Sequence, residues 1–117
     1  MKNFFQSFGF ALKGIVTALR TERNFKIQFA TGLLVITAGL YYKITITEWF
    51  VVLLAIALVL GLELMNSAIE NMVNLITKER NPLAGKIKDF AAGAVLIVSA
   101  VSAVIGILIF WKYIFNT

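Results

Sequence analysis

The chain has 117 residues, of which 60% are hydrophobic and only 15% are charged, and its formal net charge is +5. Soluble domains carry about a quarter charged residues, so this composition predicts a membrane protein of one domain, residues 1–117. The helical spacing and the length of its apolar stretches predict an all-α fold. Because the chain contains neither cysteine nor histidine, disulfides, zinc sites built on these residues and Cys or His nucleophiles are excluded.

Residues 1–27 are predicted to form an amphipathic surface helix and its lead-in. Aromatic and aliphatic residues recur at helical spacing between Phe4 and Leu19, with lysine and arginine interspersed. This pattern is typical of a helix that lies in the membrane interface, although a soluble basic helix is the alternative. No cleavable signal peptide is predicted, so we expect the N-terminus to be retained.

Three apolar stretches, residues 28–43, 48–76 and 86–112, are predicted to cross the membrane. Residues 77–85 form the second connection, where the single proline, Pro82, should interrupt any helix. Basic residues are concentrated on one side, which should be cytoplasmic, with the N-terminus. That side carries nine (Lys2, Lys13, Arg20, Arg23, Lys26, Lys78, Arg80, Lys86 and Lys88), whereas the other carries Lys43 and Lys112. This placement indicates that the basic residues face an anionic lipid surface. Nucleic acid is not expected as a partner.

One stripe of the second span is polar in an otherwise apolar helix. Glu63, Asn66, Glu70 and Asn74 share a face at 100° per residue. An ionisable residue inside a membrane costs about 2.5–3.5 kcal/mol on insertion scales, so such a stripe indicates a functional site. The structural alternative is an interhelical hydrogen-bond cluster that holds an oligomer together.

These residue types suit phosphoryl transfer, which needs cations around the phosphates and a base for the attacking oxygen. Glu22, Glu70 and Asn66 offer hard oxygen ligands for Mg²⁺. Lys88 and the second loop could hold phosphates, and Glu63, the deepest acid, could accept a proton from a hydroxyl arriving from the lipid side. Neither a Walker A loop nor a GxGxxG motif is present.

Two motifs together resemble the small prokaryotic diacylglycerol kinase family, which includes the undecaprenol kinases of Gram-positive bacteria. The first is Glu63-Leu64-Met65-Asn66-Ser67-Ala68-Ile69-Glu70, and the second begins at Lys88-Asp89-Phe90-Ala91-Ala92-Gly93. The segment Glu22-Arg23-Asn24-Phe25 also fits, so the resemblance covers nearly the whole chain.

The resemblance implies a homotrimeric bundle in the bacterial inner (cytoplasmic) membrane, with ATP and Mg²⁺ bound at sites shared between subunits. By position, Glu63 is expected to be the catalytic base, and Asn66 and Asn74 to organise the site. Glu22 and Glu70 should bind the metal and the nucleotide. Further nucleotide contacts are expected at Phe10, Glu79, Arg80, Asn81, Lys88 and Asp89, and lipid contacts at Phe8, Leu12, Lys13 and Glu63.

Three positions depart from the family pattern. Asn74 stands where the family usually has aspartate, Phe10 where some members have a tyrosine that contacts nucleotide, and Gln28 where the Gram-negative enzymes have an acid. A catalytically inactive relative that only forms a membrane oligomer is therefore the alternative to an active kinase. The sequence also leaves open whether undecaprenol or diacylglycerol is the acceptor, and whether Lys78, Arg80, Lys86 and Lys88 are only topology anchors.

Overall fold

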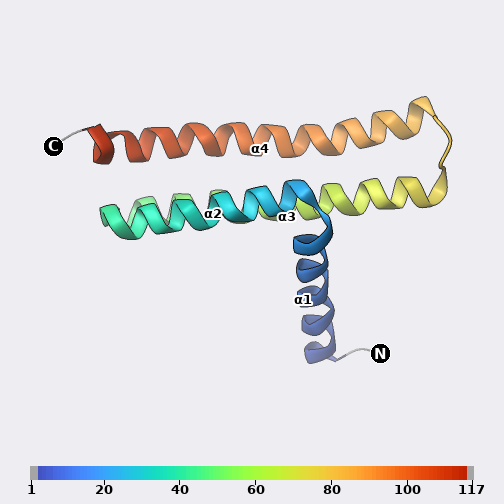
Figure 1. The fold of residues 1–117 in the computed structure, drawn as a ribbon, viewed down its shortest axis with the longest axis horizontal. Coiled ribbons are helices and arrows are strands. Elements are labelled where there is room, and N and C mark those ends of the chain that lie inside the picture. Colours follow the sequence, from blue (N-terminus) through green and yellow to red (C-terminus); the bar gives the residue numbers. More distant parts are fainter. Residues whose placement is uncertain (1–2, 116–117) are drawn as a thin grey trace.

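The computed structural model describes residues 3–115, which form four α-helices and no strand. In chain order these are α1 (Phe4–Thr21), α2 (Arg23–Tyr42), α3 (Ile46–Ile76) and α4 (Pro82–Phe115). Helices α2, α3 and α4 run along the long axis of the molecule, and α1 projects away from them at the start of α2 (Figure 1). The prediction of an all-helical chain is confirmed; Lys2 lies outside the described residues.

Helices α2, α3 and α4 are each long and apolar enough to cross a membrane. Their 20, 31 and 34 residues correspond to lengths of about 30, 46 and 51 Å, against a hydrocarbon core of about 30 Å. Helices α3 and α4 are therefore longer than the hydrocarbon core is thick. This extra length allows the polar second half of α3 to reach the membrane boundary.

The junction of α1 and α2 differs from the predicted boundary. Helix α2 begins at Arg23, five residues before the predicted span, and only Glu22 separates it from α1. Glu22 has an extended backbone, and its N–H and C=O still bond to Ala18 and Lys26 in the two helices. Phe25 is nearly inaccessible in the first turn of α2, so packing continues the helix through residues that the charge pattern assigned to the lead-in.

The connection between α3 and α4 is shorter than the predicted loop, because α4 begins at Pro82. The side-chain oxygen of Asn81 accepts hydrogen bonds from the backbone N–H groups of Leu83 and Ala84. Proline suits the first position of a helix, since the N–H that it lacks would have no partner there. Pro82 thus starts a helix, whereas the sequence predicted only that it would interrupt one.

A polar cluster joins α3 to α4 at the end opposite to this connection. The Glu48 carboxylate accepts hydrogen bonds from Tyr113 Oη and from the backbone of Thr45, and it pairs with Lys112 Nζ at 2.6 Å. Beside it, Ile44, Val52 and Phe110 form a buried apolar cluster. Together these contacts set how α3 and α4 are aligned along their length.

Gly39, near the end of α2, packs against this cluster without room for a side chain. A Cβ atom at this position would lie 2.7 Å from Cη2 of Trp49 and 3.1 Å from Cδ1 of Ile44. We therefore expect Gly39→Ala to lower the free energy of unfolding by about 1–3 kcal/mol, the usual range for overpacking. Thermal unfolding of the purified protein in detergent micelles measures this change.

Gly106→Ala is the matched control for this substitution. A Cβ atom at Gly106 has no heavy atom within 4 Å, and alanine favours a helix over glycine by about 1 kcal/mol. Equal unfolding temperatures for Gly39→Ala and Gly106→Ala would contradict the packing described at Gly39.

Candidate functional site

Three polar side chains of α3 are buried within the fold. Glu63 is 3% exposed, and Asn66 and Ser67 are each 8% exposed. Burying a carboxylate is costly unless nearby groups compensate for its lost hydration. The side chain of Asn66 lies near the Glu63 carboxylate and offers part of this compensation.

Glu63 also lies close to two other acids. The charges of Glu70 and Glu22 both act on its carboxylate. Glu70 is on the same helical face, whereas Glu22 comes from the bend between α1 and α2. The structure therefore brings the three predicted acids into one neighbourhood, where their mutual repulsion favours a bound cation.

Asn66 has a side-chain oxygen that could bind such a cation. Its Oδ1 is buried and has no hydrogen-bond partner among the described residues, although buried polar atoms are normally paired. No group of three or more acidic residues in residues 3–115 could hold a metal ion by itself. Mg²⁺ commonly takes one or two carboxylates and completes its shell with phosphate oxygens and water, so Glu22, Glu70 and Asn66 fit a Mg²⁺–nucleotide complex.

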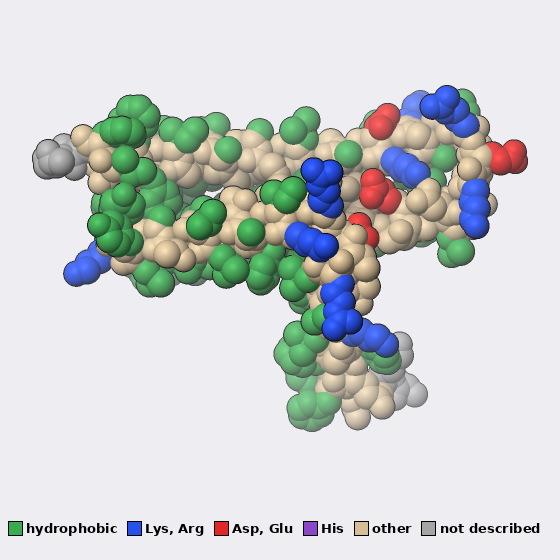
Figure 2. All heavy atoms as spheres, in the orientation of Figure 1, with side chains coloured by type: hydrophobic (Ala, Val, Ile, Leu, Met, Phe, Trp, Pro, Cys, Tyr) green, Lys and Arg blue, Asp and Glu red, His purple; other side chains and the backbone are tan. Residues whose placement is uncertain are grey.

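The second part of the site lies where α3 ends and α4 begins. A polar pocket of about 300 Å³ is lined by Asn74 and Lys88, together with Lys78, Glu79, Arg80 and Asn81 from the connection. Lys88 Nζ donates a hydrogen bond of 2.7 Å to Asn74 Oδ1. In Figure 2, acidic and basic side chains gather at this end of the molecule.

Two of the predicted nucleotide contacts differ from the rest in their surroundings. The side-chain oxygen of Asn81 caps α4, so only its amide nitrogen is left for a ligand. Asp89 follows Lys88 on α4 but is exposed and does not line the pocket.

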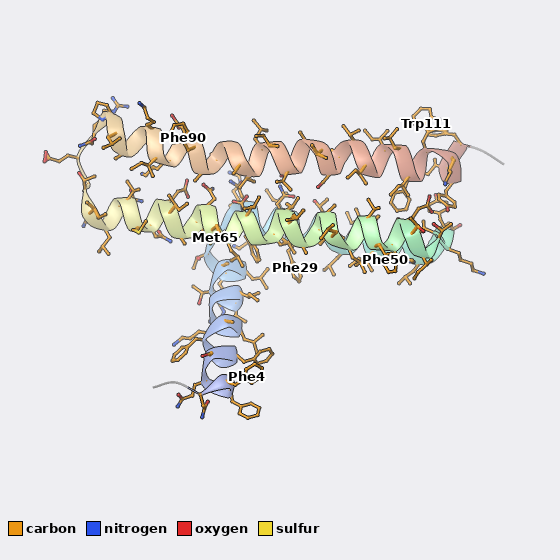
Figure 3. All side chains as sticks on the ribbon, turned by 180° about the vertical axis from the view of Figure 1, so that it is seen from behind. Phe4, Phe29, Phe50, Met65, Phe90 and Trp111 are labelled. Atoms are coloured by element: carbon orange, nitrogen blue, oxygen red, sulfur yellow. The ribbon has the colours of Figure 1, made fainter. Side chains whose placement is uncertain are left out.

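The predicted lipid contacts on α1 are not brought together with Glu63 within one chain. Phe8, Leu12 and Lys13 are exposed along α1, as is Phe10. Figure 3 shows Phe4 at the far end of this helix, away from α2, α3 and α4. An exposed row of aromatic and basic residues is what a helix at a membrane surface requires.

An apolar cavity of about 690 Å³ lies between α2, α3 and α4. Val52 and Val59 line it from α3, and Gln28 and Ser99, whose side chains are 3.5 Å apart, line it from α2 and α4. Val59 precedes Glu63 by about one helical turn of α3. The sequence reasoning missed the pair of Gln28 and Ser99, and also buried Ser67, although polar residues within apolar spans were the available signal.

Comparisons with known proteins agree with the motifs. Residues 9–110 match the family model described as prokaryotic diacylglycerol kinase. The chain is 44% identical over 110 residues to an undecaprenol kinase from Bacillus subtilis, covering 94% of this chain and 89% of that protein. It is 28% identical over 105 residues to a diacylglycerol kinase from Escherichia coli, covering 90% and 86%.

A diacylglycerol kinase from Synechocystis is 38% identical over 105 residues. That match covers 89% of this chain but only 60% of the cyanobacterial protein.

Proposed function

Because this chain belongs to the prokaryotic diacylglycerol kinase family, we propose that it is an ATP-dependent membrane kinase that phosphorylates a lipid alcohol, with undecaprenol as the acceptor. The choice of acceptor rests on the 44% identity to the undecaprenol kinase of Bacillus subtilis. The observation that best supports a catalytic site is the buried Glu63 beside Asn66, with Glu22 and Glu70 close by.

In the proposed reaction, Glu63 accepts the proton of the lipid hydroxyl as the hydroxyl oxygen attacks the γ-phosphorus of ATP. The bond between this phosphorus and the bridging oxygen of ADP breaks, and ADP leaves with the electron pair. Asn66, whose side chain lies near that of Glu63, is proposed to position the Glu63 carboxylate. A base near the attacking oxygen contributes about 10²- to 10⁴-fold to such a step.

Glu22, Glu70 and the free Oδ1 of Asn66 would hold Mg²⁺, which neutralises phosphate charge when bound. The pocket beside Lys88 and the connecting segment supplies cationic groups for the nucleotide. Lys88 is half-buried, while Arg80 is exposed at the rim. These residues would hold and orient the triphosphate, while Glu63 accepts the proton of the lipid hydroxyl.

The acceptor is proposed to approach from the bilayer. The apolar cavity between α2, α3 and α4 could take part of a long hydrocarbon chain and direct its hydroxyl toward Glu63. The exposed row of Phe8, Leu12 and Lys13 on α1 would hold this helix at the membrane surface beside the incoming lipid.

The site is proposed to face the cytoplasm in the inner membrane of a bacterium, where ATP is available. The positive-inside rule supports this, since the basic residues around α1 and the connection between α3 and α4 outnumber those at the opposite end. A homotrimer is proposed because α1 extends away from α2, α3 and α4 and the long helices leave large apolar faces exposed. In such an assembly, a neighbouring α1 could complete each site.

Purified protein in mixed micelles with radiolabelled ATP and Mg²⁺ tests the proposal. We expect label to enter undecaprenol faster than diacylglycerol when both are present at equal mole fraction. Label in diacylglycerol but not in undecaprenol would overturn the choice of acceptor. Label in neither lipid, from a folded oligomer, would instead favour the inactive relative.

A further inference from the structure

Asn74 and Lys88 form the one side-chain hydrogen bond that joins α3 to α4 at the connected end of the described residues. The distance from Lys88 Nζ to Asn74 Oδ1 is 2.7 Å, within the short range of charge-assisted hydrogen bonds. Both side chains line the polar pocket of about 300 Å³. The contact therefore holds the lysine ammonium at the wall of this pocket.

The partner of Lys88 is a neutral amide, while Lys78, Glu79 and Arg80 also contribute charged groups to the lining of the pocket. An amide oxygen accepts a hydrogen bond without cancelling the positive charge of the donor, whereas a carboxylate would form an ion pair. Within residues 3–115 the only ion pair joins Lys112 to Glu48, at the far end of the molecule. Among the described residues, Lys88 therefore forms this hydrogen bond but no ion pair.

The hydrogen bond also restricts a flexible side chain. Lysine has a four-carbon stem with about 2 kcal/mol of rotamer entropy, and a ligand that immobilises such a side chain must overcome this cost. The ammonium group has three donors, of which Asn74 occupies one. Two donors remain for phosphate oxygens.

We propose that Asn74 is a positioning residue, which holds the Lys88 ammonium toward the nucleotide phosphates. The inference rests on the proposed kinase function and adds to it a role for the side-chain oxygen of Asn74. Asn74 acts through Lys88 and need not touch the nucleotide. A substitution of Asn74 should therefore change nucleotide binding and not the proton transfer at Glu63.

The test compares Asn74→Leu and Asn74→Asp with the wild type. We measure kcat and KM for ATP with undecaprenol, and the Kd of a non-hydrolysable ATP analogue with Mg²⁺ in the absence of lipid. Asn74→Leu removes the acceptor at similar size, and we expect KM and Kd to rise about three- to tenfold with kcat little changed. Asn74→Asp keeps an oxygen acceptor for the Lys88 ammonium, so it should raise both constants less than Asn74→Leu does.

Asn71→Leu is the matched control, because Asn71 is an exposed asparagine on the same helix and does not line the pocket. It should leave KM and Kd at the wild-type values. Asn74 is itself exposed, so we expect its variants to fold, and unfolding temperatures check this. If Asn74→Leu does not fold, Asn74→Ala takes its place in the same measurements.

A double-mutant cycle with Lys88→Met separates positioning from direct contact. If Asn74 acts through Lys88, Asn74→Leu should add nothing to the higher Kd of Lys88→Met. The proposal would be overturned if Asn74→Leu raised the Kd by the same factor in the Lys88→Met background as in the wild type. An unchanged KM for Asn74→Leu alone would also overturn it. Failure of the wild-type protein to bind the analogue would contradict the proposed kinase function itself.

Discussion

Replacing Glu63 with glutamine is expected to lower kcat for lipid phosphorylation by about 10²- to 10⁴-fold while nucleotide binding is retained. Glutamine keeps the shape of the side chain and can still form a hydrogen bond with Asn66, but its amide does not accept a proton at neutral pH. The expected loss is the usual contribution of a general base. Transfer of label from ATP to lipid measures kcat, and equilibrium binding of a non-hydrolysable ATP analogue measures retention of the nucleotide.

The burial of Glu63 adds an expectation about the stability of the Glu63→Gln variant. Glu63 is 3% exposed, so removing its charge also removes a desolvation cost, and the variant should be at least as stable as the wild type. An inactive Glu63→Gln protein that unfolds at or above the wild-type temperature would therefore have lost its catalytic activity without losing its structure. Turnover at the normal rate would rule out Glu63 as the base.

Glu48→Gln provides a control on the same helix. It makes the same chemical change at the opposite end of α3, where the carboxylate contacts Lys112 and Tyr113. We expect it to lower the unfolding temperature, since those contacts are weakened, but to leave kcat close to the wild-type value. An equal loss of activity in both variants would indicate a general effect of removing acids from α3.

Replacing Glu70 with glutamine is expected to raise the Mg²⁺ concentration needed for half-maximal activity by at least about tenfold. Even residues that only support metal ligands typically change metal affinity by 10- to 100-fold when mutated, and Glu70 is proposed to be a ligand itself. Glu22→Gln should have a similar effect. Activity measured against free Mg²⁺ at saturating ATP gives this midpoint, and Mn²⁺ binding followed by electron paramagnetic resonance gives the affinity directly.

The two carboxylates should depend on each other if they share one cation. The double variant Glu22→Gln, Glu70→Gln is then expected to lose less metal affinity than the sum of the two single losses in free energy. Additive losses would indicate that the two acids do not act on the same ion. An unchanged metal requirement, with only kcat reduced, would contradict metal binding by Glu70.

The helices and the polar stripe of α3 were predictable because they depend on short-range features of the chain. Three apolar runs predicted three membrane-length helices, and helical periodicity placed Glu63, Asn66 and Glu70 on one face. The errors occurred at helix ends. Arg23 and Lys26 suggested a lead-in where α2 already begins, and Pro82 suggested a break where Asn81 caps the first turn of α4. At such positions, packing and capping outweigh the charge and proline patterns.

The sequence by itself determined the order of four helices, the three candidate spans and the polar face of α3, because backbone hydrogen bonding and side-chain periodicity are properties of neighbouring residues. Only the tertiary structure decided that Glu22 lies near Glu63, that Asn74 holds Lys88, and that Glu48 pairs with Lys112. Each of these contacts joins different helices or crosses the bend between them. Such contacts depend on how one helix is rotated and shifted against another, and residue spacing does not specify this.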